Sequence, residues 1–249
     1  MFNIAFALDC DESFSFGCRV NYFDIQGTTI EPREDRIKLF FQIWKSVMAY
    51  LVLRRYSGRG AGSADETLAK VQSELFPKLK EAGGLLRYTT LVMDDGGIAS
   101  SSVYENQEAA QRGVQVAADV VSKAQFLQGY KLDQVLEGEI ARRIDHNSQA
   151  QAKYGVARIF KTSAPATQIA DAMADPPDVF AVPGRVRTFV VQLADGRVGG
   201  FSSFDSKETA DRVSEEIKRV RANPNAPMVK LAPDVAEQFG GRIVNSSGT

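Results

Sequence analysis

The sequence is poor in the residues that most often bind metals or carry out catalysis. Of its 249 residues, one is a histidine and two are cysteines. Cys10 and Cys18 lack a CxxC spacing and have no histidine near them, so neither a zinc site nor a disulfide framework is predicted. This cysteine usage favours a reducing, cytoplasmic location. The single histidine, His146, lies in a polar stretch, where we expect a solvated side chain rather than a ligand or a base.

Long apolar runs and an excess of charge are also missing. No run of about 18 apolar residues occurs, so no membrane span is predicted, and residues 1–9 lack the basic and apolar regions of a secretion signal. The 30 basic and 31 acidic residues are interspersed and leave a net charge of −1. A nucleic acid or an anionic membrane surface is therefore not expected as a partner. The composition is that of an ordinary globular protein.

The first 47 residues differ in composition from the rest. They hold both cysteines, the only tryptophan and seven of the fifteen phenylalanines. Apolar residues from Ile37 to Met48 recur at helical spacing, which favours a helix that docks on the rest of the chain or on a partner. The alternative is an extension without a fold of its own, because Met48 opens a clean strand and could be the true start.

An internal duplication organises the remainder of the chain. Residues 84–112 align without gaps on residues 184–212 at an offset of 100. Fixed self-similarity of this kind indicates a repeated structural unit. The identical pairs are Gly84/Gly184, Arg87/Arg187, Asp95/Asp195, Gly96/Gly196, Ser102/Ser202, Glu108/Glu208, Ala110/Ala210 and Arg112/Arg212.

The repeated segment predicts a β-hairpin. Residues 86–93 and 98–104 are rich in β-branched and aromatic residues, and Asp95-Gly96 between them is a tight-turn signal. Asp195-Gly196 occupies the same place in the second copy. Glycine suits this position because it tolerates the positive φ that hairpin turns require.

A helix is predicted after each hairpin. Asn106 and Ser206 stand where a side-chain oxygen would cap the helix, with a glutamate in the first turn. The expected buried stripes are Ala110, Val114, Ala117, Ala118 and Val121 in the first copy, and Ala210, Val213, Ile217 and Val220 in the second.

The flanking segments complete a βαββαβ pattern in each copy. First strands are predicted at 50–56 and 154–160, and closing strands at 136–140 and 239–243. A capping box at Ser63 and Glu66 begins a helix with apolar Leu68, Val71, Leu75, Phe76 and Leu79. The second copy has only a short helical stretch, 166–174, before Pro176-Pro177. Polar residues 145–152 read as the linker between the copies.

This order, with a GxLRYxxxxxDDGG-type hairpin and a closing Glu-Gly-Glu-Ile strand, resembles the dimeric α/β barrel superfamily, in particular its antibiotic-biosynthesis-monooxygenase-like members. The resemblance covers residues 49–143 and 153–245. It implies an α+β fold in which two ferredoxin-like units with antiparallel sheets, 48–145 and 153–249, pack as an intramolecular pseudo-dimeric barrel. Each sheet has helices on one face and leaves the other needing a cover.

The resemblance also implies a ligand pocket between the sheet and the helices of each unit. Activities in the superfamily range from cofactor-independent oxygenation of aromatic polyketides to haem degradation, and many members have no known activity. The histidine of the haem-using branches has no match in this sequence. No cofactor and no metal are therefore expected.

Six residues of the first copy are the candidate ligand-binding set: Arg54, Tyr56, Arg87, Tyr88, Ser102 and Tyr104. The arginines could bind an oxygen anion by forked hydrogen bonds, and the hydroxyl groups could supply donors amid apolar walls. The alternatives are ion pairs for the arginines and simple packing for the aromatic rings. The glycine-rich loop 57–63 lacks a phosphate-binding fingerprint and reads as a flexible connection.

Two functions remain open. The first is a non-catalytic barrel that binds a small molecule, such as a small aromatic ligand, or that serves a structural role. The second is a cofactor-independent monooxygenase-like enzyme that stabilises an anion developing on an aromatic or polyketide-like substrate. The shortened helix of the second copy favours a working pocket in the first copy. Both a monomer and a homodimer are compatible with the sequence.

Overall fold

The computed structural model describes residues 5–9, 19–23, 29–30, 48–60, 62–123, 127–147, 149–174, 182–223, 225, 227–231 and 234–248. The chain divides into two compact units, Met1–Lys45 and Ser46–Thr249. In the first unit, a three-stranded antiparallel sheet forms from β1 (Ala5–Asp9), β2 (Arg19–Phe23) and β3 (Thr29–Ile30). The helix predicted from Ile37 to Met48 lies outside the described residues, apart from Met48 itself.

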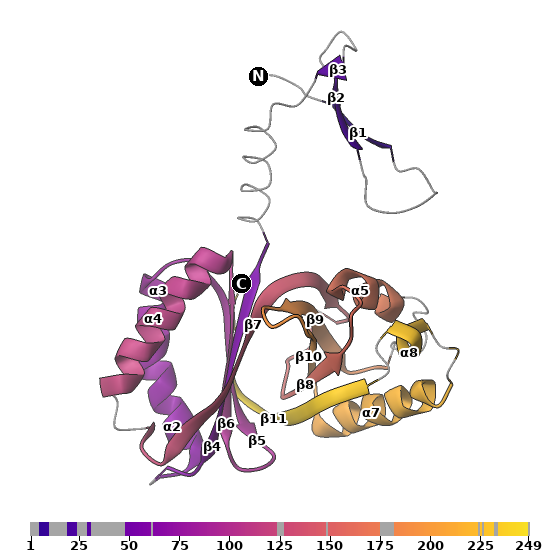
Figure 1. Ribbon diagram of the computed structural model, residues 1–249. Helices are drawn as coiled ribbons and strands as arrows, with labels where there is room; N and C mark the ends of the chain where they lie inside the picture. The colour runs from indigo at the N-terminus through magenta and orange to yellow at the C-terminus, as the bar shows by residue number, and fades with distance from the viewer. Residues whose placement is uncertain are drawn as a thin grey trace. The chain divides into compact units, whose positions relative to one another are not determined.

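The second unit contains the two predicted repeats, and their order of strands and helices is confirmed. The helices of the two repeats lie on opposite sides in Figure 1. The first repeat consists of β4 (Tyr50–Gly58), α2 (Ala64–Lys70), η1 (Val71–Leu75), α3 (Phe76–Glu81), β5 (Leu85–Met93), β6 (Ile98–Tyr104), α4 (Gln107–Lys123) and β7 (Tyr130–Asp145). The second consists of β8 (Tyr154–Lys161), α5 (Ala166–Ala174), β9 (Arg185–Leu193), β10 (Val198–Phe204), α7 (Lys207–Arg221), α8 (Pro227–Leu231) and β11 (Asp234–Gly248).

The eight strands of this unit close into one antiparallel barrel in the order β10-β8-β11-β5-β6-β4-β7-β9. Each repeat supplies four neighbouring strands, and its last strand pairs with the second strand of the other repeat. The two junctions match residue by residue, with Ile140 opposite Val191 and Ile243 opposite Leu91. Closure pairs both edges of each four-stranded sheet, so neither is left as a free edge.

Equivalent glycines allow the two sheets to meet. A Cβ atom on Gly138 would lie 2.0 Å from the backbone oxygen of Gln192, and one on Gly241 would lie 2.4 Å from the backbone oxygen of Val92. Both distances are far below any van der Waals contact, and the obstacle in each case is backbone. The close approach at each junction therefore depends on glycine.

The predicted turns and caps are confirmed. Gly96 and Gly196 both have a φ of 87° in their hairpin turns. Asn106 Oδ1 accepts a hydrogen bond of 2.9 Å from the Ala109 N–H, and Ser206 Oγ accepts one of 3.2 Å from the Thr209 N–H. These oxygens satisfy amides that the first turn of a helix leaves unpaired.

The expected buried stripes are confirmed in part. Ala110 and Ala117 are buried in α4, and Ala210, Val213 and Ile217 are buried in α7. The remaining valines of the stripes, Val114, Val121 and Val220, are half-buried. The prediction for Ala118 is wrong, because this residue is exposed. It lies about 100° around the helix from Ala117, beyond the edge of the stripe that faces the sheet.

Side chains alternate along each strand between the inside of the barrel and the helices. On β4, Leu51 and Leu53 belong to an interior cluster with residues from both repeats, whereas Tyr50 and Val52 pack under α4. The barrel therefore has one shared interior core, and each repeat has its own core beneath its helices.

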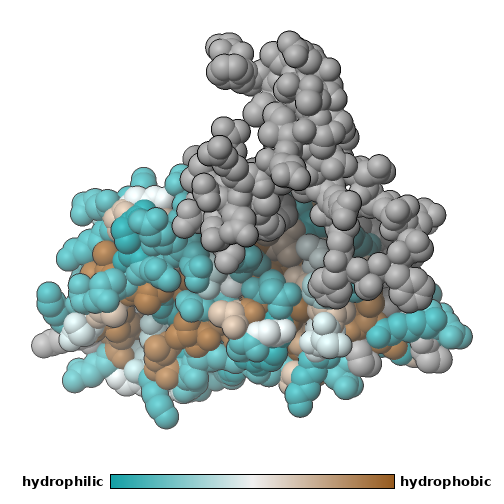
Figure 2. Space-filling model, turned by 45° about the horizontal axis from the view of Figure 1, so that its top comes forward, coloured by the Kyte–Doolittle hydropathy of each residue, from teal (hydrophilic) through white to brown (hydrophobic). Residues whose placement is uncertain are grey.

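The surface carries hydrophobic groups mainly as separate patches. Hydrophilic residues cover much of the face in Figure 2, interrupted by smaller hydrophobic areas. The large hydrophobic residues that are exposed in the described ranges are Leu86, Leu132 and Val135. No helix within those ranges is long and apolar enough to cross a membrane.

Candidate functional site

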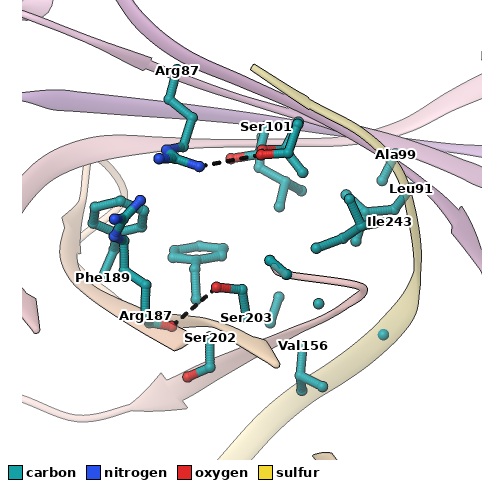
Figure 3. Close-up of a pocket in the computed structure, with 18 of the residues that line it drawn as sticks. Arg87, Leu91, Ala99, Ser101, Val156, Arg187, Phe189, Ser202, Ser203 and Ile243 are labelled. Carbon is teal, nitrogen blue, oxygen red and sulfur yellow. Dashed lines mark hydrogen bonds between the residues drawn. The ribbon is translucent and has the colours of Figure 1, made fainter. Parts of the chain in front are cut away.

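The inside of the barrel holds a partly open cavity of about 90 Å³. Figure 3 shows Arg87 and Arg187 at one end of this cavity, and Leu91, Ala99 and Ile243 at the other. Much of its wall is apolar and comes from both repeats, including Leu91, Met93, Phe189, Phe201, Phe239 and Ile243. We refer to it as the interior cavity.

Two small residues of the second repeat line part of this space. In the repeat alignment, Gly155 and Ala157 on β8 stand at the positions of Leu51 and Leu53 on β4. Gly155 and Ala157 line the interior cavity, whereas Leu51 is fully buried in the interior core. Leu53 lines the same cavity as Ala157, and Arg87 lines it together with Arg187, so equivalent positions of both repeats meet in this one space.

Positive charge gathers at the arginine end of the interior cavity. Asp145 accepts hydrogen bonds from Arg187 Nε and, at 2.7 Å, from Arg143 Nε. Arg87 Nη1 donates to Ser246 Oγ at 3.2 Å. Burial lowers the pKa of Arg87, and repulsion from Arg187 and Arg143 lowers it further. Three guanidinium groups thus face one carboxylate.

A second cavity, of about 330 Å³, lies between the β5–β6 hairpin and α7. Tyr154 donates a hydrogen bond of 2.5 Å to Asp94 Oδ2, and Lys207 lies 3.7 Å from the same carboxylate. Burial and the negative charge of Asp94 raise the pKa of Tyr154 to about 12. The charged groups of this cavity are paired with one another, so it offers no unpaired charge to a ligand.

On the helix-facing side of the first sheet lies a group of buried polar residues, which we call the repeat-one polar cluster. It consists of Arg54, Tyr88, Thr90, Ser102 and Tyr104, and each is at most 7% exposed. In the strand register, Arg54 on β4 and Thr90 on β5 both lie opposite Ser100 on β6. Tyr88 on β5 lies opposite Ser102 on β6. Tyr104 follows Ser102 by two residues on the same strand. The five side chains therefore occupy neighbouring positions on one face.

Five polar atoms of this cluster are buried without a well-formed hydrogen bond among the described residues: Arg54 Nη2, Tyr88 OH, Thr90 Oγ1, Ser102 Oγ and Tyr104 OH. Ser100 lies near the hydroxyl of Tyr88 and Ser102 near that of Tyr104, and each lowers the pKa of its tyrosine by less than burial raises it. Burial raises the pKa of Tyr88 well above its ordinary value and also raises the pKa of Tyr104. Both phenols thus stay protonated near neutral pH and can donate as well as accept. Buried polar groups are normally satisfied, so this concentration requires an explanation.

The helices above the cluster carry two local irregularities. The first helix changes to a π-turn, η1, whose Val71 and Leu75 pack in the same core cluster as Tyr88. Gln72 Oε1 in that turn is also buried without a partner in the described part of the chain. Such turns occur frequently at functional sites. In α4, a Cβ on Gly113 would lie 2.2 Å from Tyr104 OH, so glycine makes room for the phenol.

The second repeat satisfies its polar groups at the corresponding positions. Arg158, the counterpart of Arg54, donates to Gln238 Oε1 at 3.0 Å and to Ser214 Oγ at 2.7 Å. Thr188, the counterpart of Tyr88, lies 3.0 Å from Ser202 Oγ. The counterparts of Thr90 and Tyr104 are Val190 and Phe204, which have no polar side-chain atom. The two repeats thus differ in hydrogen bonding on a common backbone.

Five of the six sequence-predicted binding residues lie on this helix-facing side. Arg54, Tyr88, Ser102 and Tyr104 are in the cluster, and half-buried Tyr56 packs in the same core as Tyr88. Arg87 instead faces the interior cavity. Sequence reasoning missed Thr90, although two-residue spacing from Tyr88 was a usable signal.

His146 contributes to neither of the two cavities. Its Nε2 lies 3.3 Å from Thr188 Oγ1. The residue is exposed, as the sequence predicted, but partial burial of its ring and the charge of Arg185 lower the pKa of His146 to about 4. A haem held by a histidine ligand does not fit these two cavities. Among the described residues, no group of three His, Cys, Asp or Glu side chains could hold a metal ion.

No protein-family model matches the sequence, and no curated protein matches it. Among solved structures, a candidate monooxygenase from Fusobacterium nucleatum subsp. nucleatum superposes with a TM-score of 0.56 and 12% identity, over 82% of this chain and 95% of that one. An anthrone oxidase-like protein gives 0.52 and 15%, over 81% and 93%.

A mutant of chlorite dismutase from Candidatus Nitrospira defluvii gives a TM-score of 0.55 and 9% identity, over 84% of this chain and 94% of that one. At such identities the likeness concerns the fold. Together with the matched sheet junctions and the closed eight-stranded barrel, it shows that the chain has the fold of a dimeric α/β barrel, with both halves of the barrel in one polypeptide.

Proposed function

We propose that this protein is a non-catalytic small-molecule-binding barrel whose ligand lies between the sheet and the helices of the first repeat. The observation that supports the proposal is the contrast between the repeats. Polar atoms of the repeat-one polar cluster have no well-formed hydrogen bond among the described residues, whereas Arg158 and Thr188 of the second repeat are hydrogen-bonded.

The energetic cost of the cluster supports a bound molecule. A buried polar atom without a partner costs about 1–3 kcal/mol, so five of them would lower the stability of the protein substantially. Ordered water or a ligand with several polar atoms would remove this cost. The neighbouring core residues, such as Leu75 and Leu79, are apolar. A small aromatic molecule with two or more oxygen substituents has the matching chemistry.

A thermal-shift screen of the full chain with phenols, hydroxyquinones and hydroxynaphthoates tests this proposal, because a ligand that binds only the native state raises the melting temperature. For a compound that binds, Tyr104→Phe should weaken the affinity by about tenfold, the effect of losing one hydrogen bond. This substitution installs the residue that the second repeat carries at Phe204.

The matched control is Tyr154→Phe, which removes a tyrosine hydroxyl from the second cavity instead. Its affinity for the compound should equal that of the unmodified protein. If no compound raises the melting temperature, or if both variants weaken binding equally, the proposed ligand site is wrong.

A second candidate function is cofactor-independent oxygenation of an aromatic or polyketide-like substrate. The observation in its favour is Arg54 Nη2, a buried cationic donor without a partner among the described residues, which could stabilise a substrate anion. Two of the similar structures are named as a candidate monooxygenase and an anthrone oxidase-like protein. Oxygen uptake with an anthrone, abolished in Arg54→Met, would favour this function; its absence with a bound anthrone would favour simple binding.

The assembly and location proposed here are a monomer in a reducing compartment. All eight barrel strands pair within one chain, so no second chain is needed to complete the sheet. The spacing of Cys10 and Cys18 supports the reducing, cytoplasmic setting. Analytical ultracentrifugation tests the first point, and a mass of two chains would contradict it.

A further inference from the structure

We infer that the interior cavity is a separate binding site for a small monocarboxylate that carries a short apolar group. The carboxylate would lie at the arginine end, between Arg87 and Arg187, and the apolar group would enter the cavity. The inference does not rest on the proposed function, because the interior cavity and the repeat-one polar cluster lie on opposite faces of the sheet.

The charge at the arginine end points to an anion. Asp145 is shared by Arg187 and Arg143, which leaves a surplus of positive charge. Among the described residues, Arg87 has no carboxylate within ion-pair distance, and its guanidinium donates to the neutral hydroxyl of Ser246. An anion placed here would relieve the repulsion among the arginines and accept forked hydrogen bonds from guanidinium groups.

The walls of the cavity limit the rest of the ligand. Phe189, Phe201 and Phe239 offer only apolar surface, so a second charge on the ligand would be buried without a partner. The volume is about 90 Å³. Since one water molecule takes up about 30 Å³ of liquid, the space suits a group of only a few carbon atoms. Phosphate fits less well because it carries a second charge, and a long fatty acid fits less well because it is too large.

The repeat alignment shows which residues of the two repeats meet at the cavity. At the equivalent positions the first repeat carries Leu51, which packs in the interior core, and Leu53, which lines the same cavity as Ala157. A Cβ on Gly155 would lie 2.7 Å from Leu91 Cδ2, so the side chain of Leu91 takes up the place beside this glycine.

Isothermal titration of the full chain with acetate, propionate and butyrate tests the inference. Burial of each added methylene should tighten binding by about fourfold until the cavity is full. Butyramide, which has nearly the same shape without the charge, should bind at least tenfold more weakly than butyrate. Equal affinity for butyrate and butyramide, or no gain from acetate to butyrate, would overturn the assignment.

Two variants locate the site. Arg87→Gln should weaken butyrate binding by about tenfold, and Ala157→Leu, which restores the residue found in the first repeat, should abolish it by filling the cavity. Arg112→Gln is the matched control, because it removes the same charge from an exposed position on α4 and should leave the affinity unchanged. If Ala157→Leu does not fold, two comparisons still test whether the arginine end binds the carboxylate. One compares Arg87→Gln with Arg112→Gln, and the other compares butyrate with butyramide.

The same titrations separate this site from the one in the proposed function. Tyr104→Phe should leave butyrate binding intact, because Tyr104 lies on the helix-facing side. Loss of butyrate binding in Tyr104→Phe but not in Arg87→Gln would refute the interior site while leaving the proposed function standing. Butyrate binding with no response to any aromatic compound would support the interior site and refute the proposed function.

Discussion

Thr90 offers a direct test of whether the repeat-one polar cluster is unsatisfied in the free protein. Its side chain is 0% exposed and Oγ1 has no partner among the described residues. Thr90→Val replaces this hydroxyl by a methyl group of similar shape, and the second repeat carries Val190, also 0% exposed, at the same position. Because an unpartnered buried hydroxyl costs about 1–3 kcal/mol, the variant should be more stable by about 1 kcal/mol or more.

Thr188→Val is the matched control. Thr188 is equally buried, but its Oγ1 accepts a hydrogen bond of 3.0 Å from Arg185 Nη2 and lies 3.0 Å from Ser202 Oγ. Removing this hydroxyl should lower the free energy of unfolding by about 1–3 kcal/mol, since it breaks a satisfied buried network. The same chemical change is thus expected to have opposite signs in the two repeats.

Urea denaturation at neutral pH without ligand measures both effects, and unchanged m-values would show that the comparison concerns stability alone. In thermal melts, each kcal/mol should shift the melting temperature by about 2–4 °C for a unit of this size. If Thr90→Val loses stability as Thr188→Val does, the Thr90 hydroxyl is satisfied in the native protein. The argument for a ligand site in the first repeat would then fail.

Two further predictions concern the sheet junctions and His146. Gly138→Ala and Gly241→Ala should each lower the free energy of unfolding in urea by about 1–3 kcal/mol, because the added Cβ meets backbone. Gly200→Ala is the control and should be tolerated, because its Cβ would lie 3.4 Å from a side-chain atom of Phe160. Equal losses at all three glycines would refute this reasoning. The lowered pKa of His146 means that the unfolded chain binds its proton first, so stability should fall as the pH drops from 6.5 toward 4. His146→Asn should flatten the pH dependence between pH 7 and 5, where carboxylates contribute little, and an unchanged slope would contradict it.

Local signals in the sequence predicted the elements of the fold well. The Asp95-Gly96 turn, the capping box at Ser63 and the caps at Asn106 and Ser206 depend on neighbouring residues and are confirmed. Closure of the barrel also followed from the duplication, because two half-covered sheets require one another. The register of the strands at the junctions could not be predicted from the duplication, because it is set by contacts between residues about 50 and 150 positions apart.

The candidate site was only partly predictable. Arg87 and Tyr88 are adjacent on a strand, and side-chain alternation alone places them on opposite faces. The same rule would have added Thr90 to the group that contains Tyr88. Which polar atoms lack a partner could not be read from the sequence, because partners such as Gln238 and Ser214 of Arg158 come from other elements.

The two proposed sites share β5 as a common wall, and this arrangement makes the assignments separable. Arg87 points into the interior cavity and Tyr88 points toward the helices, one residue apart. Arg87→Gln should therefore impair only the carboxylate, and Tyr88→Phe only the aromatic ligand. If each variant impaired both ligands, a distortion of β5 would explain the losses better than any missing contact, and neither site could be assigned from substitutions on this strand.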